Sequence, residues 1–240
     1  MKVLSRLIVC IGLACASALY GQFGPEIPEW QSVKIVQTVD PVFPFLLTQQ
    51  GLTHGEARIA VNTDAKGKLV EWLVVEYTRA EFAREAVDAL KQWSFVPARL
   101  RGDAVGTTIE VYFYFEAKGV VVSTTRIDKL ERATLFETDR IAYQPRSLRE
   151  LDRIPTPLST VAPAYPAGLA QKGVHGRVTV DFYIDETGVV RMPAVSPEDN
   201  SDLTALSVDA LRQWRFEPPT RNGKPVLVKA SQVFNFGSGS

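Results

Sequence analysis

Two histidines are the only imidazole groups in this chain, and an aspartate follows each after the same interval: His54 with Asp64, and His175 with Asp185. Imidazole and carboxylate groups commonly bind metal ions or move protons in enzymes. However, no trio of cysteine, histidine and carboxylate surrounds either histidine in the sequence, as a metal or catalytic site would require. We therefore interpret the histidines as polar turn residues before strands, and the aspartates as formers of hairpin turns.

Other patterns that would indicate an enzyme are missing from the sequence. It has no Ser-His-Asp arrangement, no phosphate-binding loop and no metal-ligand spacing, so we expect no catalytic residue, metal or cofactor. Trp93 and Trp214 could stack on a ligand, but each ends an amphipathic helical pattern, which favours a place in the core. The 27 basic residues balance the 27 acidic ones, so no basic field favours nucleic-acid binding.

The interval between the two histidines recurs along most of the chain. From the histidines onward, matched residues differ by 121 (175 − 54 = 121) without insertion or deletion. The matches are mainly glycine, proline and aromatic residues: Asp64/Asp185, Gly67/Gly188, Trp93/Trp214, Phe95/Phe216, Pro97/Pro218, Gly102/Gly223, Phe113/Phe234 and Phe115/Phe236. Ahead of the histidines, a Pro-x-aromatic-Pro motif at residues 41–44 matches residues 163–166 with an offset of 122. The sequence therefore predicts an internal duplication.

Each copy predicts the same order of elements. In the second copy these are a short helix at 167–172, two strands at 177–184 and 189–195, a helix ending near Trp214, and a last strand at 225–236. The hairpin loops contain Asp and Gly, and apolar residues alternate along the strands. We expect an α+β fold in which each copy has a three-stranded antiparallel sheet with two helices packed on one face.

The domain limits follow from the repeat. We expect domains at residues 32–119 and 154–237, joined by a charge-rich linker at 120–153. A linker of this length is expected to contain some helix or strand of its own.

The N-terminal residues 1–21 are typical of a secretory signal peptide. Lys2 and Arg6 precede a short apolar run, and Ala16-Ser17-Ala18 offers a cleavage site. Both cysteines, Cys10 and Cys15, lie in this segment, so we expect a mature protein without disulfides. An uncleaved membrane anchor, or a lipoprotein modified at Cys15, is the alternative. Either way the sequence predicts a periplasmic or envelope location.

The motifs of the second copy carry a family resemblance. Its Pro-Ala-Tyr-Pro at 163–166 and its V-x-V-x-F-x-I-D-x-x-G pattern at 178–188 resemble the first half of the C-terminal domain of TonB, a bacterial energy transducer. Its A-L-R-Q-W-R-F-x-P pattern at 210–218 and Asn-Gly-Lys-Pro at 222–225 resemble the second half. The first copy matches less well, with Ser94 in place of the arginine that follows the tryptophan.

This resemblance implies a function in transport across the outer membrane. A TonB-like periplasmic protein would bind a segment of an outer-membrane TonB-dependent receptor, or of another envelope protein, by β-strand addition. We expect the last strand of the second copy to accept it, with the residues Val226, Val228, Ala230, Ser231, Gln232, Val233 and Phe234. A Gln232→Pro substitution is expected to remove one N–H donor from that strand.

The alternative is a structural or regulatory envelope protein that uses the same edge strands without energy coupling, or that pairs them in a homodimer. Residues 7–25 contain no histidine or charged residue for contact with an inner-membrane proton-driven complex. Residues 22–40 reach only ~65 Å when fully extended, which argues against transmission of force between membranes. Tyr112 and Tyr114 would either be exposed and contact a partner or pack against the other domain.

Overall fold

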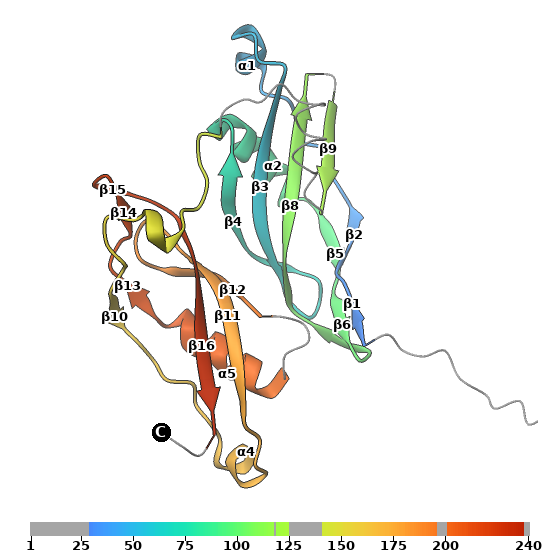
Figure 1. Cartoon of the computed structure of the whole chain (residues 1–240). Helices are drawn as coiled ribbons and strands as arrows, with labels where there is room; N and C mark the ends of the chain where they lie inside the picture. Colours follow the sequence, from blue (N-terminus) through green and yellow to red (C-terminus); the bar gives the residue numbers. More distant parts are fainter. Residues whose placement is uncertain (1–28, 118, 125–140, 196–200, 238–240) are drawn as a thin grey trace, which may run out of the picture.

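The computed structural model describes residues 29–117, 119–124, 141–195 and 201–237, which form two similar α+β regions (Figure 1). The predicted signal peptide and residues 125–140 of the predicted linker lie outside these residues. The limits of the two domains stay predictions. Within the described part, no helix has the length and hydrophobicity needed to cross a membrane.

The first region is an antiparallel sheet with the strand order β4-β3-β8-β9. It consists of β3 (His54–Thr63), β4 (Leu69–Tyr77), β8 (Thr107–Glu116) and β9 (Gly119–Ser123), with α2 (Ala80–Leu90) between β4 and β8 in sequence. The strand β9 lies at the start of the predicted linker. The expected three strands are therefore present, and β9 adds a fourth next to β8.

The second region is an antiparallel sheet with the strand order β12-β11-β16. It consists of β11 (Gly176–Ile184), β12 (Val190–Ala194) and β16 (Val228–Phe236), together with the helices α4 (Ala167–Gln171) and α5 (Ser201–Arg212). The predicted three-stranded antiparallel sheet packed against helices is confirmed in both regions.

Short elements complete each region. In the first they are β1 (Trp30–Gln31), β2 (Lys34–Gln37), α1 (Phe45–Gln49), β5 (Ser94–Val96), β6 (Ala98–Leu100) and β7 (Asp103–Val105). In the second they are η1 (Leu148–Glu150), β10 (Pro157–Ser159), β13 (Arg215–Phe216), β14 (Thr220–Arg221) and β15 (Lys224–Pro225). The ladder β2–β5 corresponds to the ladder β10–β13, so each copy joins its leading strand to the segment after its long helix.

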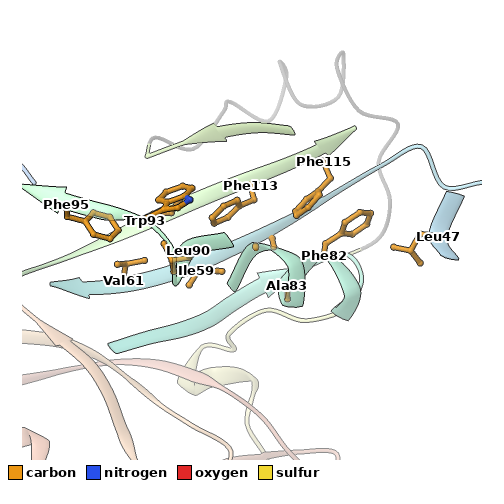
Figure 2. Close-up of a cluster of buried hydrophobic side chains, with 13 residues drawn as sticks. Leu47, Ile59, Val61, Phe82, Ala83, Leu90, Trp93, Phe95, Phe113 and Phe115 are labelled. Carbon is orange, nitrogen blue, oxygen red and sulfur yellow. The ribbon is translucent and has the colours of Figure 1, made fainter. Parts of the chain in front are cut away.

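Each sheet buries one face against its long helix. In the first region, Phe82 and Leu90 of α2 are fully buried against Ile59, Phe113 and Phe115 of the sheet (Figure 2). In the second region the corresponding core contains residues of α5, β11, β12 and β16: Leu203, Leu211, Val178, Val180, Phe182, Ile184, Val190, Val228, Ala230, Phe234 and Phe236. The alternation of apolar residues in the strands therefore sets which face becomes the core.

The two tryptophans make equivalent hydrogen bonds. The indole N–H of Trp93 donates to the carbonyl oxygen of Val39 over 2.9 Å, and that of Trp214 donates to Val161 over 2.8 Å. Trp93 is 6% exposed, whereas Trp214 is half-buried. Both are therefore core residues, but the second is less completely covered.

The hairpin glycines are equivalent as well. Gly67 and Gly188 have φ angles of +79° and +86°, a region that side chains rarely adopt. A Cβ atom on Gly67 would lie 2.2 Å from the carbonyl oxygen of Phe95, and one on Gly188 would lie 1.9 Å from that of Phe216. Glycine is required at both positions, because the backbone has a positive φ angle and because a Cβ atom would clash with a carbonyl oxygen. This explains why both copies have glycine there.

The faces opposite the helices bring the two regions together. Ala60, Leu73 and Val75 of the first sheet form one buried cluster with second-region residues that include Tyr183 and Met192. Figure 1 shows β12 on the side of the second sheet that is nearer to the first. The two copies therefore share an apolar interface as well as a chain connection.

A partly buried ionic cluster lies at this interface. Arg58 contacts Glu76 and Glu110 over 2.9 Å each, and Tyr112 donates to Glu110 over 2.8 Å. Tyr183 of the second copy donates to the other oxygen of Glu110 over 3.0 Å. Burial would raise the pKa of Glu110, but the charge of Arg58 and the three donors outweigh it and lower that pKa. Tyr112 is therefore part of the inter-copy cluster, and Tyr114 beside it is buried.

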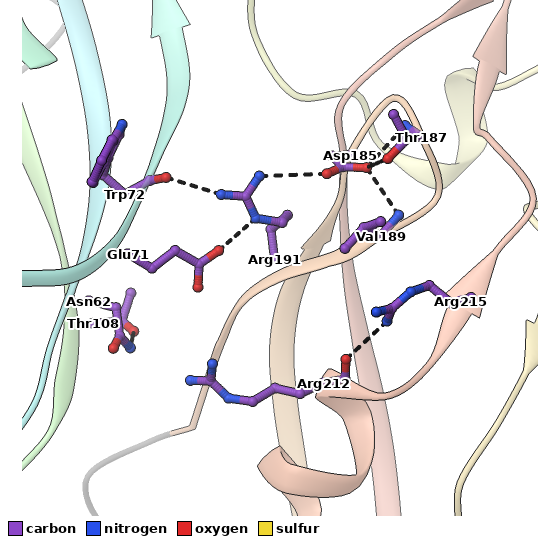
Figure 3. A network of polar contacts seen from close by, with 10 residues as sticks. All are labelled: Asn62, Glu71, Trp72, Thr108, Asp185, Thr187, Val189, Arg191, Arg212 and Arg215. Atoms are coloured by element: carbon purple, nitrogen blue, oxygen red, sulfur yellow. Dashed lines mark hydrogen bonds and ion pairs between the residues drawn. The ribbon is translucent and has the colours of Figure 1, made fainter.

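A second ion pair crosses the interface at β4, the edge strand of the first sheet. Arg191 contacts Glu71 over 2.6 Å and Asp185 over 3.6 Å, and it donates to the carbonyl oxygen of Trp72 over 3.2 Å (Figure 3). Because Arg191 bonds both to β4 and to the hairpin of its own copy, it fixes the two regions relative to each other.

We expect Trp93→Ala to destabilise the protein by about 3–5 kcal/mol, since it removes a buried indole together with its hydrogen bond. Trp214→Ala should cost less, because that ring is only half-buried in the described structure. Urea denaturation of the two variants measures the difference. If Trp214→Ala lowers the free energy of unfolding as much as Trp93→Ala does, or more, the assigned burial of the two rings is contradicted.

We expect Tyr183→Phe to cost about 1.5–3 kcal/mol at pH 7, because Glu110 loses a donor across the interface. The pKa of Glu110 is lower in the folded state than in the unfolded state, so ionised Glu110 stabilises the fold fully above its unfolded-state pKa of about 4.3. This stabilisation is lost as the pH falls through the folded-state pKa. The difference between wild type and variant should therefore shrink at pH 3. Tyr165→Phe is the control, because Tyr165 donates to the carbonyl oxygen of Val174 rather than to a carboxylate. A Tyr183→Phe effect that is independent of pH would contradict this account.

Candidate partner-binding edge

The histidines lie apart from each other, one at the start of each copy's first long strand. His54 begins β3 and is half-buried, and its Nδ1 lies 3.1 Å from the hydroxyl of Thr53. His175 is exposed and precedes β11. In the described ranges, no group of three or more histidine, cysteine, aspartate or glutamate residues is arranged to hold a metal ion. Both histidines thus occupy turn or strand-end positions.

The aspartates close the hairpins, as predicted. One carboxylate oxygen of Asp64 accepts hydrogen bonds from the backbone N–H groups of Lys66 and Lys68, over 2.8 and 2.9 Å. These bonds lower the pKa of Asp64. Asp185 accepts the equivalent two backbone bonds in the second copy, over 3.0 Å each. The carboxylates therefore stabilise turns.

The strand β16 lies at one edge of the second sheet. One side of it pairs with β11 over its whole length, from Val228 opposite Ile184 to Phe236 opposite Gly176. On its other side, the pairing within the described residues is one parallel bridge between Arg146 and Val228. From residue 231 to residue 236, this side of β16 is an open edge in the part of the chain that the structure describes (Figure 1).

The bridge at Arg146 shows which backbone groups face the open edge. Lys229 donates its N–H to the carbonyl oxygen of Arg146 over 3.1 Å. Backbone groups alternate along a strand, and the register with β11 is uninterrupted, so Ser231, Val233 and Asn235 also direct their N–H and C=O groups outward. Gln232 directs its N–H toward β11. Gln232→Pro would therefore remove a donor from the ladder between β16 and β11, and not from the outer edge of β16.

The side chains proposed for the site divide into two groups. Val228, Ala230 and Phe234 belong to the core of the second copy, and Val226 precedes the strand. Ser231, Gln232 and Val233 are at least partly exposed: the hydroxyl of Ser231 donates to Asp181, and the amide of Gln232 donates to the carbonyl oxygen of Val233 over 2.8 Å. The edge therefore offers mainly backbone groups to a partner.

The first copy has the same edge, but β9 fills it. Along β8, Tyr112 is paired with Ser123, and Tyr114 is paired with Val121. With the offset of 121, Tyr112 and Tyr114 correspond to Val233 and Asn235 of β16. These backbone groups are thus paired with a strand in the first copy, whereas no strand pairs with them in the described part of the second copy, where the carbonyl oxygen of Val233 accepts the side-chain amide of Gln232.

The strand β9 falls where the sequence predicts the start of a linker, so sequence reasoning alone does not identify it. The signal was present: three consecutive valines follow Gly119, directly after the last predicted strand. A glycine followed by β-branched residues is typical of a hairpin strand.

Comparison with known proteins agrees with the repeat. Residues 39–117 and 161–237 each match the family described as Gram-negative bacterial TonB protein C-terminal. Protein TonB of Xanthomonas campestris pv. campestris (strain B100) is 32% identical over 75 residues, which are 31% of this chain and 34% of that protein. Protein TonB of Pseudomonas aeruginosa PAO1 is 35% identical over 81 residues, which are 33% of this chain and 24% of that protein. The match thus spans about a third or less of these relatives.

A solved structure is also similar. The solution NMR structure of the P. aeruginosa TonB C-terminal domain has 34% sequence identity and a TM-score of 0.32. The similarity covers 38% of this chain and 91% of that structure. The two family matches together cover well over half of the 240 residues. The family is not one of enzymes. The chain belongs to the TonB C-terminal family, of which it carries two tandem copies.

Proposed function

We propose that this protein works in the periplasm and binds a segment of an outer-membrane receptor as an added strand on β16. Membership of the family implies a TonB-like role in energy transduction to outer-membrane receptors. The proposal adds the location, the binding mode and the strand that binds.

The open edge of β16 is the observation that carries this proposal. Proteins normally cover or interrupt an exposed strand edge, because its unpaired N–H and C=O groups pair readily with other chains. In the described structure, Ser231, Val233 and Asn235 direct such groups outward, and no strand of the chain pairs with them. An extended segment of a receptor would satisfy these groups by β-strand addition.

The quality of the family match supports the choice of the second copy. Its Trp214-Arg215-Phe216 and Asn222-Gly223-Lys224 keep the family pattern, whereas Ser94 replaces the arginine in the first copy. The first copy also buries one sheet face against the second through Arg58 and Glu110. The first copy would then hold the second in place, while the second binds the partner.

A structural or regulatory protein without energy coupling is the second candidate. The buried interface between the copies favours it, because a fixed two-domain body with an open edge on β16 would also suit an adaptor between envelope proteins. Deletion of the protein distinguishes the two candidates. Loss of receptor-dependent uptake in the deletion strain would support energy transduction. Intact uptake in that strain, together with receptor binding by the purified protein, would support the adaptor.

We expect Val233→Pro to weaken binding of a peptide from the N-terminal segment of a TonB-dependent receptor at least tenfold, about 1.4 kcal/mol. The substitution removes one N–H at the open edge, where proline is tolerated by the fold. Val233→Ala keeps the N–H and should bind like wild type. Isothermal titration calorimetry measures the affinities, and circular dichroism checks the fold.

The neighbouring position provides the contrast. Gln232→Pro should destabilise the second copy itself, because the N–H of Gln232 faces β11 opposite Val180. If folded Val233→Pro protein bound the peptide with undiminished affinity, the partner site would lie elsewhere.

A further inference from the structure

A cleft of about 880 Å³ lies between the two copies. The ends of β3, β6 and β8 line it from the first copy, and the end of β12 with one face of α5 lines it from the second. Ligand sites in proteins have volumes of about 300–1,000 Å³ and often lie between domains. None of the described residues that line this cleft belongs to β16. The cleft therefore has the size and the position of a ligand site, separate from the open edge.

The wall formed by the first copy is apolar where the repeated fold does not require it. This wall contains Trp30, Val70 and Leu100, and Val70 is 55% exposed. With the offset of 121, Val70 and Leu100 correspond to Arg191 and Arg221 of the second copy. The same positions thus accept charged side chains in this fold. Apolar side chains from neighbouring strands that face one cleft favour an apolar ligand.

The wall formed by α5 carries one charge of each sign. Asp209 and Arg212 are exposed, lie about one helical turn apart, and both line the cleft. Figure 3 shows the side chain of Arg212 extending from α5 toward Asn62 and Thr108 of the first copy. Among the described residues, none forms an ion pair with the side chain of Asp209 or Arg212.

The first copy shows that such a pair can close on itself. The counterparts of Asp209 and Arg212 in α2 are Asp88 and Lys91, whose side chains form an ion pair over 3.0 Å. The remaining charged residue of the lining, Asp64, accepts backbone N–H groups of its own turn. The two charges of α5 are therefore the ones that a ligand in the cleft can reach.

We propose that the cleft binds one single-chain amphipathic lipid with a zwitterionic head group. The anionic part of the head group pairs with Arg212, and its ammonium group pairs with Asp209. The hydrocarbon chain lies on the apolar wall of Trp30, Val70 and Leu100. A purely anionic head group would leave the charge of Asp209 unpaired beside it, so the site selects against that class. This inference goes beyond receptor binding on β16 and does not depend on it.

The test uses lysophosphatidylethanolamine as the probe, added to the full-length protein below the concentration at which the lipid forms micelles. Isothermal titration calorimetry should show one lipid bound per chain. Ala205→Trp should abolish binding, because Ala205 is an exposed residue of α5 in the cleft and an indole there occupies the space. Ala167→Trp is the matched control, since that exposed alanine lies on α4 outside the cleft. Circular dichroism checks the fold of both variants.

The head group is tested by exchanging charges. Lysophosphatidylglycerol, which lacks the ammonium group, should bind wild-type protein about tenfold more weakly, as expected for the loss of one charged contact. Asp209→Asn should weaken binding of the zwitterionic lipid and strengthen binding of the anionic one. Arg212→Gln should weaken binding of the zwitterionic lipid about tenfold. Arg177→Gln is its control, because Arg177 is an exposed arginine of β11 outside the cleft.

The outcomes separate this inference from the proposed function. No lipid binding by wild-type protein, or undiminished binding by folded Ala205→Trp protein, would overturn the site. Equal affinity for the two lipids would overturn the zwitterionic head group. Val233→Pro should leave lipid binding unchanged, so failure of the lipid site and failure of receptor binding are distinct results.

Discussion

A β-strand carries hydrogen-bonding groups on both sides, and the rest of this structure depends on how the outer side of each last strand is satisfied. Buried or semi-buried N–H and C=O groups need partners, so an edge strand must be paired, covered or left for another chain. In the first copy β9 pairs with β8. In the second copy a bridge at Arg146 protects only the start of β16 within the described chain. One duplicated domain thus reaches two solutions to the same constraint.

The interface between the copies explains how they came to differ. Arg58, Glu110 and Tyr112 of the first copy form the ionic cluster that Tyr183 completes from the second. With the offset of 121, Arg58 corresponds to Thr179, a small residue that could not form the same ion pairs. The outer face of the first sheet is therefore specialised for contact between the copies. This cluster keeps the first copy against its twin, while the outer side of β16 has no paired strand in the described part of the chain.

Much of the fold could be predicted from local signals. Asp64 and Gly67, with their counterparts in the second copy, marked the hairpins, and alternating apolar residues marked the strands and their buried face. Trp93 marked the end of the long helix and its packing on the sheet. These features depend on residues close in sequence, where turn chemistry and periodicity are informative.

The features that decide function were harder to predict, because they depend on contacts between distant segments. The pairing of β16 with Arg146 shows which backbone groups of this strand face outward. The pattern of apolar residues along the strand does not predict this. The ionic cluster joins Arg58 to Tyr183 across the copies, and neither residue belongs to a motif. The strand β9 did have a local signal in its valines, but the charged residues that follow led to its interpretation as a linker.

Amide hydrogen exchange, resolved by residue, tests the central claim most directly. If the outer side of β8 is paired and that of β16 is open, the N–H groups of Tyr112 and Tyr114 should exchange slowly in the free protein, while those of Val233 and Asn235 exchange fast. A receptor segment should then slow exchange at Val233 and Asn235 and leave Tyr112 and Tyr114 unchanged. Slow exchange at Val233 and Asn235 in the free protein, equal to that at their counterparts, would contradict the account.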